Sequence, residues 1–542
     1  MQNGELSDEW LWKDAGDLME NYRTLLIILI LALLVRSVFI GSYFTGDAID
    51  TVGPARNYAE IGRAAFYATN SDTSMEMARV EDGLYFVFTH PPMRTLLYSL
   101  WAVLFGFNSL MILLPIIIGI LSIFFIYLTG RQLYSEKTGL IAALLAALIR
   151  YHFYSSTIAF GDNLLMLTVA ASMYFFCRYI ATKRSVYLAP FFIFFILGFL
   201  TKLSAIAIIP VLLATAFILN EKIKFKTSFL AVAAVVSLSF LAVYFSYPIT
   251  ESLTGVSNQD FNFFESYIKT FMAARVGYQD IAYEKAFYAS SFLWQMTPFF
   301  AALLLIALIR LKRNKAYLIL SSWLVITFLI GFASSGQDFQ RLMVIAIAPA
   351  IILVAQYISD IKWEKNRAYI LFGAATAFIL AYLTGLNDML PYYNLSIVAF
   401  FFLIAGIFIF MPKNKQLLLG ASIGLSVFFL IGTNFLIAIN SSAVQQLVSS
   451  VEERDYPYKE LWTTRDISLY LAPAGEPSFL QRPELSEKFI RENGVKYVAF
   501  YSVYEEEKII TISSLCEDEP FFAVVNGRRV GLACKISAVA PK

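Results

Sequence analysis

Residues 25–50 read LLIILILALLVRSVFIGSYFTGDAID, an apolar run that ends in two aspartates. Between Leu25 and Phe44, Arg36 is the one charged residue, and a helix of this length can cross a bilayer core of about 30 Å. Asp47 stands three residues after the run. An ionisable group at the rim of a membrane is costly, which makes it a functional candidate. The alternative is an acid that caps a helix at a water-exposed turn.

The rest of the chain repeats this apolar pattern. Of its 542 residues, 58% are hydrophobic and 15% are charged, and the mean hydropathy is +0.64. Soluble domains carry roughly 25% charged residues. The composition therefore predicts a polytopic α-helical membrane protein. The first run lacks a small-residue cleavage site, so we expect an uncleaved span. Basic residues do not gather with aromatic ones, so no nucleic acid partner is expected.

About thirteen transmembrane helices are predicted from the apolar runs. They cover residues 25–44, 109–129, 138–157, 162–180, 186–201, 203–219, 227–247, 291–309, 316–333, 342–359, 368–386, 395–411 and 416–440. Alternate short connections each carry at least two Lys or Arg, whereas those between them hold only Lys202 and Arg341. Because Lys and Arg mark cytoplasmic loops, we expect a multi-pass protein of the cell membrane with a cytoplasmic N-terminus.

Residues 93–107 are apolar but too short for a span, and Arg94 lies near their start. We expect an amphipathic helix that lies in the outer interface or re-enters the membrane. If it spanned the bilayer, every later loop would change side and the charge pattern would invert.

This topology predicts three parts of the chain. They are a cytoplasmic segment at 1–24, a transmembrane domain at 25–440 and a soluble extracytoplasmic domain at 441–542. The transmembrane domain has two long outer loops, at 45–108 with interfacial helices and at 248–290.

The C-terminal domain is predicted to be a small α+β or mainly β module. Residues 495–504 and 521–525 alternate as strands do, and Asn526-Gly527 is a hairpin turn signal. In an oxidising exterior, we expect Cys516 and Cys534 to form a disulfide.

Few ionisable side chains remain on the outer face once the sidedness is set. They are Asp47, Asp50, Arg56, Glu60, His90, Arg94, Asp162, Lys202, Asp338 and Arg341. These residues come from connections far apart in the sequence, yet all on one face. Carboxylates beside Lys and Arg indicate a general base next to a cationic clamp for an anionic leaving group.

Each candidate also has a structural interpretation. Lys202 and Arg341 could extend from helix ends to the headgroup layer. Asp162 could be the N-cap of the fourth span. His90, which precedes Pro91-Pro92, could orient a turn, and Glu60 could face water.

Motifs for other chemistry are absent from the sequence. No zinc-type spacing, Walker-type loop or Ser, Cys or His nucleophile motif occurs. No cofactor is implied, although a divalent cation is left open. His152, in a cluster of aromatic residues, is expected to be structural or interfacial. With no site for a soluble nucleotide donor, an outside reaction needs an activated substrate delivered within the bilayer.

The order of these residues resembles the GT-C glycosyltransferases, in the branch of the lipid A aminoarabinose transferases and protein O-mannosyltransferases. The matching segments are Asp47, Tyr58-Ala-Glu-Ile-Gly-Arg63, His90-Pro91-Pro92, Gly130-Arg-Gln-Leu-Tyr-Ser135, Asp162-Asn-Leu-Leu165, Leu200-Thr201-Lys202 and Arg341 before a Pro-containing span. The similarity is good over residues 25–220 and loose beyond. Ala48 departs from the Asp-Glu pair of many relatives, so Asp50 is a candidate for the second acid.

The resemblance implies a GT-C-like catalytic domain that performs an inverting sugar transfer at the extracytoplasmic face. The donor would be a polyprenyl-phosphate-linked sugar, and the acceptor a hydroxyl of a lipid, glycan or protein. Asp47 would be the general base. Asp50, Glu60, His90 and Asp162 would serve catalysis or acceptor binding, and Lys202, Arg341 and Arg94 would hold the donor phosphate.

Two other classes of protein stay open. A lipid or solute transporter or flippase should show inverted repeats and broken helices that meet at the midplane. Neither is evident in the sequence, and the charged residues gather at one rim. A catalytically inactive relative is the other alternative, because the acid expected after Asp47 is missing.

Overall fold

The structure is a computed structural model of the whole chain. It describes residues 15–38, 40, 49–64, 77–79, 85–87, 91–159, 161–219, 225–255, 262, 264–265, 268, 298–333, 344–360, 420, 423–424, 427, 441–457, 461–463, 471, 496–501, 506–525 and 528–536.

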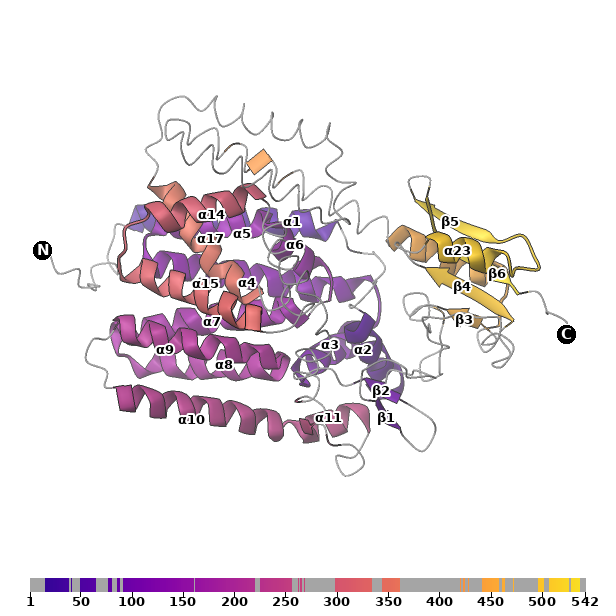
Figure 1. Cartoon of the computed structure of the whole chain (residues 1–542), viewed down its shortest axis with the longest axis horizontal. Coiled ribbons are helices and arrows are strands. Elements are labelled where there is room, and N and C mark those ends of the chain that lie inside the picture. Colours follow the sequence, from indigo (N-terminus) through magenta and orange to yellow (C-terminus); the bar gives the residue numbers. More distant parts are fainter. Residues whose placement is uncertain are drawn as a thin grey trace, which may run out of the picture.

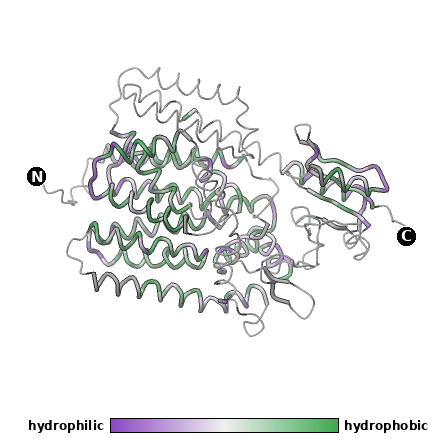
Figure 2. Tube along the Cα trace, viewed as in Figure 1, coloured by the Kyte–Doolittle hydropathy of each residue, from purple (hydrophilic) through white to green (hydrophobic). Residues whose placement is uncertain are grey.

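A bundle of apolar helices forms the larger part of the molecule (Figure 1). Its helices are α1 (Ala15–Ser37), α4 (Leu113–Leu133), α5 (Glu136–Leu148), α6 (Arg150–Thr157), α7 (Gly161–Thr182), α8 (Leu188–Thr201), α9 (Ile208–Leu219), α10 (Phe225–Tyr244), α14 (Pro298–Arg310), α15 (Lys315–Ala333) and α17 (Val344–Ser359). Short 3-10 turns η3 (Ser109–Ile112), η4 (Ser185–Tyr187) and η5 (Leu203–Ala207) join some of them. Figure 2 shows hydrophobic residues along the helices and hydrophilic ones toward their ends. This pattern is typical of helices that cross a bilayer.

The length and composition of the described helices agree with a membrane protein. Three helical segments are long and apolar enough to cross a membrane: Leu110–Leu133, Gly161–Thr182 and Ala234–Thr254. The bent pair of α5 and α6 could form a fourth span. The number thirteen stays a prediction, since the predicted spans at 368–386 and 395–411 lie outside the described residues.

The predicted single span at 138–157 is wrong in one respect. The helix breaks at Ile149, whose ψ of 126° is extended, and α5 and α6 meet at an angle of 61°. Ile149 is β-branched and disfavours helix only slightly. At the break, α1 contacts both α5 and α6 through Arg36, which hydropathy does not reveal.

One end of the bundle carries the short elements of the first loop. They are α2 (Ile49–Ile61), β1 (Met77–Arg79), β2 (Tyr85–Val87) and α3 (Met93–Phe105), with α11 (Tyr247–Thr254) beside them (Figure 1). The antiparallel strands β1 and β2 form a small hairpin. The backbone N–H of Ala64 donates to the carbonyl of Leu253, which joins the end of α2 to α11. Two loops far apart in sequence therefore meet at this end.

The helix α3 covers most of the predicted residues 93–107. It buries Tyr98, Ser99 and Ala102, while the apolar Leu100 and Leu104 on the opposite face are 48% and 73% exposed. An exposed apolar face is suited to contact with lipid, and a position in the bilayer interface stays a prediction. Gly106 ends it with a positive φ of 76°, which a residue with a Cβ adopts rarely.

A hydrophobic cluster fixes this end of the bundle. It joins Val52 and Ala55 of α2, Tyr98 of α3, and Ile158 and Ala159 just before α7. Because α2 begins two residues after Asp47, this cluster brings the segment that follows the first span close to the start of α7.

The C-terminal part contains a four-stranded mixed sheet in the order β3-β4-β6-β5. The strands are β3 (Leu461–Thr463), β4 (Tyr497–Tyr501), β5 (Phe521–Val525) and β6 (Arg528–Lys535), and α23 (Glu506–Ser513) packs against them. Strands β4 and β5 lie where the sequence alternates. The expected disulfide between Cys516 and Cys534 is present, with a Cα–Cα distance of 5.8 Å.

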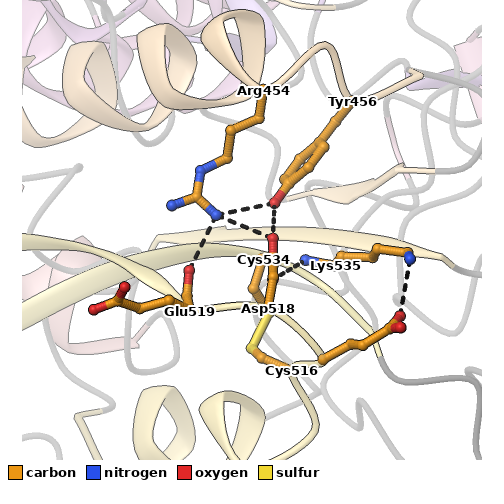
Figure 3. A network of polar contacts seen from close by, with 8 residues as sticks. Arg454, Tyr456, Cys516, Asp518, Glu519, Cys534 and Lys535 are labelled. Atoms are coloured by element: carbon orange, nitrogen blue, oxygen red, sulfur yellow. Dashed lines mark hydrogen bonds and ion pairs between the residues drawn. A yellow bond between two sulfur atoms is a disulfide. The ribbon is translucent and has the colours of Figure 1, made fainter.

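Asp518 connects the sheet to the helical residues 441–453 (Figure 3). Its Oδ2 accepts from the Tyr456 hydroxyl at 2.6 Å and from Arg454 Nη1 at 3.1 Å, and its Oδ1 accepts from the backbone N–H of Lys535 at 2.7 Å. Burial and the hydrogen bond to Asp518 raise the pKa of the Tyr456 hydroxyl above its usual value. The disulfide at Cys516 holds this carboxylate close to β6.

Candidate functional site

Three consecutive residues at the start of α7 are each held by a different element. The side chain of Arg94 on α3 lies against Gly161. Lys202 and Tyr151 contact Asp162. Asn163 donates from Nδ2 to the carbonyl of Pro115 at 2.7 Å. The N-terminal end of α7 is therefore a point where α3, α4, α6 and α8 converge.

The centre of this site is an ion pair between Lys202 and Asp162. Lys202 Nζ lies 3.0 Å from Asp162 Oδ1, and the two side chains are only 11% and 7% exposed. The Tyr151 hydroxyl lies 3.4 Å from the other carboxylate oxygen, Oδ2. A charge pair shielded from water has a strong interaction and a fixed geometry. Lys202 therefore does not extend to the headgroup layer, and that interpretation is wrong.

The position of Lys202 follows from the break between α8 and η5. Lys202 has extended angles, φ −161° and ψ 130°, and its N–H donates to the carbonyl of Gly198. The preceding helix is strongly apolar and ends at Thr201. Because this helix has no charged residue, Lys202 has no local partner there, and its ammonium group pairs with the carboxylate of Asp162 on α7.

Arg94 adds a second cation at the same place. A Cβ added at Gly161 would lie 2.9 Å from Arg94 Cδ and 3.4 Å from Nη1. The stem of the arginine thus crosses the helix start at a point where only glycine leaves room. Helix N-termini favour anions because their N–H groups lack intrahelical partners. Arg94 and Lys202 both lie at this N-terminus.

The other predicted residues have different outcomes. Glu60 is exposed and forms an i,i+4 ion pair with Arg56 at 2.8 Å, and its role in catalysis or acceptor binding stays a prediction. Asp50 lies in the first turn of α2, and its side chain is outside the described part. Asp47, His90 and Arg341 also lie outside the described residues and stay predictions.

Asp162 forms an ion pair between helices and is not the N-cap of α7. It lies in the first turn of α7, one residue inside the helix, and its carboxylate pairs with a lysine 40 positions away. Tyr151 was not predicted, although it belongs to the aromatic cluster around His152. Within the described ranges, no group of three or more His, Cys, Asp or Glu could hold a metal ion.

The segment that contains these residues resembles a known protein family. Residues 89–247, which include Arg94, Tyr151, Asp162 and Lys202, match the model of a family described as dolichyl-phosphate-mannose-protein mannosyltransferase. The predicted resemblance to the GT-C glycosyltransferases is confirmed. No curated protein sequence matches the chain significantly.

Solved structures show the same GT-C fold. The crystal structure of ArnT from Cupriavidus metallidurans bound to undecaprenyl phosphate has a TM-score of 0.62 and 13% identity, over 95% of this chain and 99% of that one. Its apo form has a TM-score of 0.60 and 13% identity, over 94% and 97%. The archaeal oligosaccharyltransferase AglB from Archaeoglobus fulgidus, with an inhibitory peptide and a dolichol-phosphate, has a TM-score of 0.46 at 13% identity, over 90% and 70%. The last similarity is too low to use further.

Proposed function

We propose that the protein transfers a sugar from a polyprenyl-phosphate-linked donor to an acceptor hydroxyl at the extracytoplasmic face of the membrane, with inversion. The family match over residues 89–247 supports the glycosyltransferase class. The lipid carrier bound to ArnT supports a polyprenyl phosphate as the donor carrier. A transporter or flippase is not favoured by this match.

The observation that carries the proposal is the buried Lys202–Asp162 pair at the start of α7, with Arg94 beside it. Lys202 has three N–H donors, and Asp162 takes one of them. The remaining donors, the arginine and the helix N-terminus form a suitable environment for a phosphate. We place the phosphate of the donor there.

In the proposed reaction, Asp47 removes the proton from the acceptor hydroxyl. The acceptor oxygen attacks the anomeric carbon while the bond from that carbon to the phosphate oxygen breaks on the opposite face. The proton stays on the carboxylate, and the phosphate on the lipid gains one negative charge. Lys202, Arg94 and Arg341 stabilise that added charge, which develops in the transition state.

The orientation proposed for the membrane places the N-terminus in the cytoplasm and residues 441–542 outside. The basic connections support this orientation. Lys137, Lys183 and Arg184 lie at the far end of the bundle from the site, since the 22 residues of α7 span about 33 Å. The sugar donor would then reach the site after it has crossed to the outer leaflet.

Purified protein incubated with a panel of radiolabelled polyprenyl-phosphate sugars and membrane extract tests this function. Labelled product should form with one donor, and Asp47→Asn should abolish it while leaving expression and folding intact. Lys202→Ala should raise KM for the donor more than KM for the acceptor. Asp455→Asn and Lys312→Ala, at exposed sites outside the cluster, serve as controls.

Three results would count against the proposal. The absence of product with every donor would remove the proposed activity. Full activity of Asp47→Asn would show that Asp47 is not the general base, and Asp50 would be the next carboxylate to test. Equal effects of Lys202→Ala on donor and acceptor would argue against a phosphate contact.

A further inference from the structure

Arg36 is a fully buried cation in the last turn of α1. Its Nε donates to Ser156 Oγ at 2.7 Å, and its Nη1 donates to the carbonyl of Ala32 at 3.0 Å. Its Nη2 lies 3.3 Å from both the carbonyl of Ala147 and Nδ1 of His152. Within the described part of the chain, no carboxylate pairs with it.

These contacts lie on both sides of the break in the α5–α6 pair. In a continuous helix, the carbonyl of Ala147 would accept from the N–H of Tyr151. The break at Ile149 removes this partner, and Arg36 supplies a donor in its place. The C-terminus of a helix also carries partial negative charge, which a guanidinium complements. Arg36 thus stabilises the bend by both hydrogen bonding and charge.

The same guanidinium holds α6 along its length. It contacts His152 in the first turn and Ser156 in the second, and it lies 4.9 Å from the ring centroid of Phe153. Helix α4 also approaches α6 closely, because a Cβ at Gly119 would lie 2.4 Å from Ser156 Cβ. The short helix α6 is therefore held by both α1 and α4.

The helix α6 also carries a residue of the candidate site. Tyr151, next to His152, contacts Asp162, and Asp162 holds Lys202. Arg36 is thus connected to the ion pair through one rigid helical turn. A buried cation among neutral groups is expensive, so its presence indicates more than packing.

We propose that Arg36 is a positioning residue of the transfer reaction. It holds α6 across the bend so that Tyr151 fixes the orientation of Asp162 and, through it, of Lys202. This role rests on the proposed function above. Arg36 itself touches no substrate, because it is fully buried.

The sharpest test compares two adjacent serines in the full-length enzyme. Ser155 and Ser156 are both fully buried and both donate to the carbonyl of His152, but only Ser156 accepts from Arg36. Ser156→Ala should lower kcat/KM for the donor about tenfold, the worth of one hydrogen bond to a charged group. It should also speed amide hydrogen exchange over residues 150–157. Ser155→Ala should change neither quantity more than twofold.

A second comparison uses two arginines. Arg36→Lys keeps the charge but cannot reach three partners at once, and it should lower kcat/KM for the donor by about ten- to a hundredfold. Arg178→Lys is the control, since Arg178 bonds Gln132 and Tyr187 near the far end of α7. If the Arg36→Lys variant does not fold, the comparison of Ser155→Ala with Ser156→Ala still tests the proposal.

Coupling to Tyr151 separates positioning from a structural role. Tyr151→Phe combined with Ser156→Ala should be no worse than Tyr151→Phe alone, because both act through Asp162. The proposal would be overturned if the double variant lost kcat/KM by the product of the two single losses. Equal rates of amide hydrogen exchange over residues 150–157 in Ser155→Ala and Ser156→Ala would also overturn it. If the wild-type enzyme uses no donor, the proposed function fails and the reaction role of Arg36 fails with it. Hydrogen exchange would still report whether Arg36 holds α6.

Discussion

The buried pair of Lys202 and Asp162 gives the most direct test of the site. At a distance of 3.0 Å, a unit charge pair is worth about 5–6 kcal/mol with an effective dielectric constant near 20. Lys202→Met leaves the Asp162 carboxylate buried without its partner, and Asp162→Asn leaves the ammonium. Each change should destabilise the protein by about 3–5 kcal/mol.

The double variant Asp162→Asn, Lys202→Met carries no buried charge at this place. It should therefore recover most of the lost stability, so that the coupling energy of the cycle is about 3 kcal/mol or more. Transfer activity should not return, because the proposed contact of Lys202 with the donor phosphate is removed. Reversible unfolding in mixed micelles measures the stabilities, and the radiolabel assay measures transfer.

The partly exposed pair of Arg56 and Glu60 is the control. It has a similar distance of 2.8 Å, but Glu60 is 40% exposed and the pair is an i,i+4 contact on α2. Its cycle should give about 0.3–0.5 kcal/mol. If the cycle at Lys202 and Asp162 were equally small, the pair would be solvated. The reasoning that places a dry phosphate site at α7 would then be refuted.

Three further predictions concern other contacts. Gly161→Ala should displace the Arg94 stem, since the new Cβ would lie 2.9 Å from Cδ, and donor KM should rise while Tm changes little. Cys516→Ser with Cys534→Ser should lower the unfolding free energy of the C-terminal part by about 3 kcal/mol, from the 18-residue separation, as measured by its resistance to proteolysis. The raised pKa of Tyr456 favours its neutral form, so the stability it adds is complete below about pH 10 and falls as the pH rises further. Tyr456→Phe should flatten that decline in a pH series of thermal unfolding.

Hydropathy predicted the helices well where the end of a span is also the end of an apolar run. The spans expected at 162–180 and 316–333 agree closely with α7 and α15. Hydropathy failed at 138–157, because residues on both sides of Ile149 are suited to a helix. The bend depends on Arg36, which lies more than a hundred positions away. Periodicity along one segment contains no information on such a partner.

For the candidate site, the sequence predicted which residues lie on the same side of the membrane, but not which of them contact one another. Charge asymmetry places Asp162 and Lys202 on the same side, but it does not pair them. Glu60 satisfied the same criterion and turned toward Arg56 and solvent. The distinguishing signal is local. Glu60 has the basic residue Arg56 one helical turn before it, whereas the helix that precedes Lys202 contains no acidic residue that could pair with it. A search for ionisable residues that lack a local partner would have separated the two.

The pairing of Lys202 with Asp162 also has a consequence for catalysis. An unpaired lysine would attract the donor phosphate and the product phosphate by its full charge, which strengthens binding without accelerating the reaction. The pair as a whole carries no net charge, so its attraction for the ground state is modest. Its N–H donors nevertheless stay fixed in a place with little water, where they respond strongly to the negative charge gained as the bond to the sugar breaks. In the proposed reaction, Tyr151 and Asp162 therefore weaken the attraction of Lys202 for the ground-state donor without removing its contact to the phosphate, so Lys202→Ala should lower kcat as well as raise the donor KM.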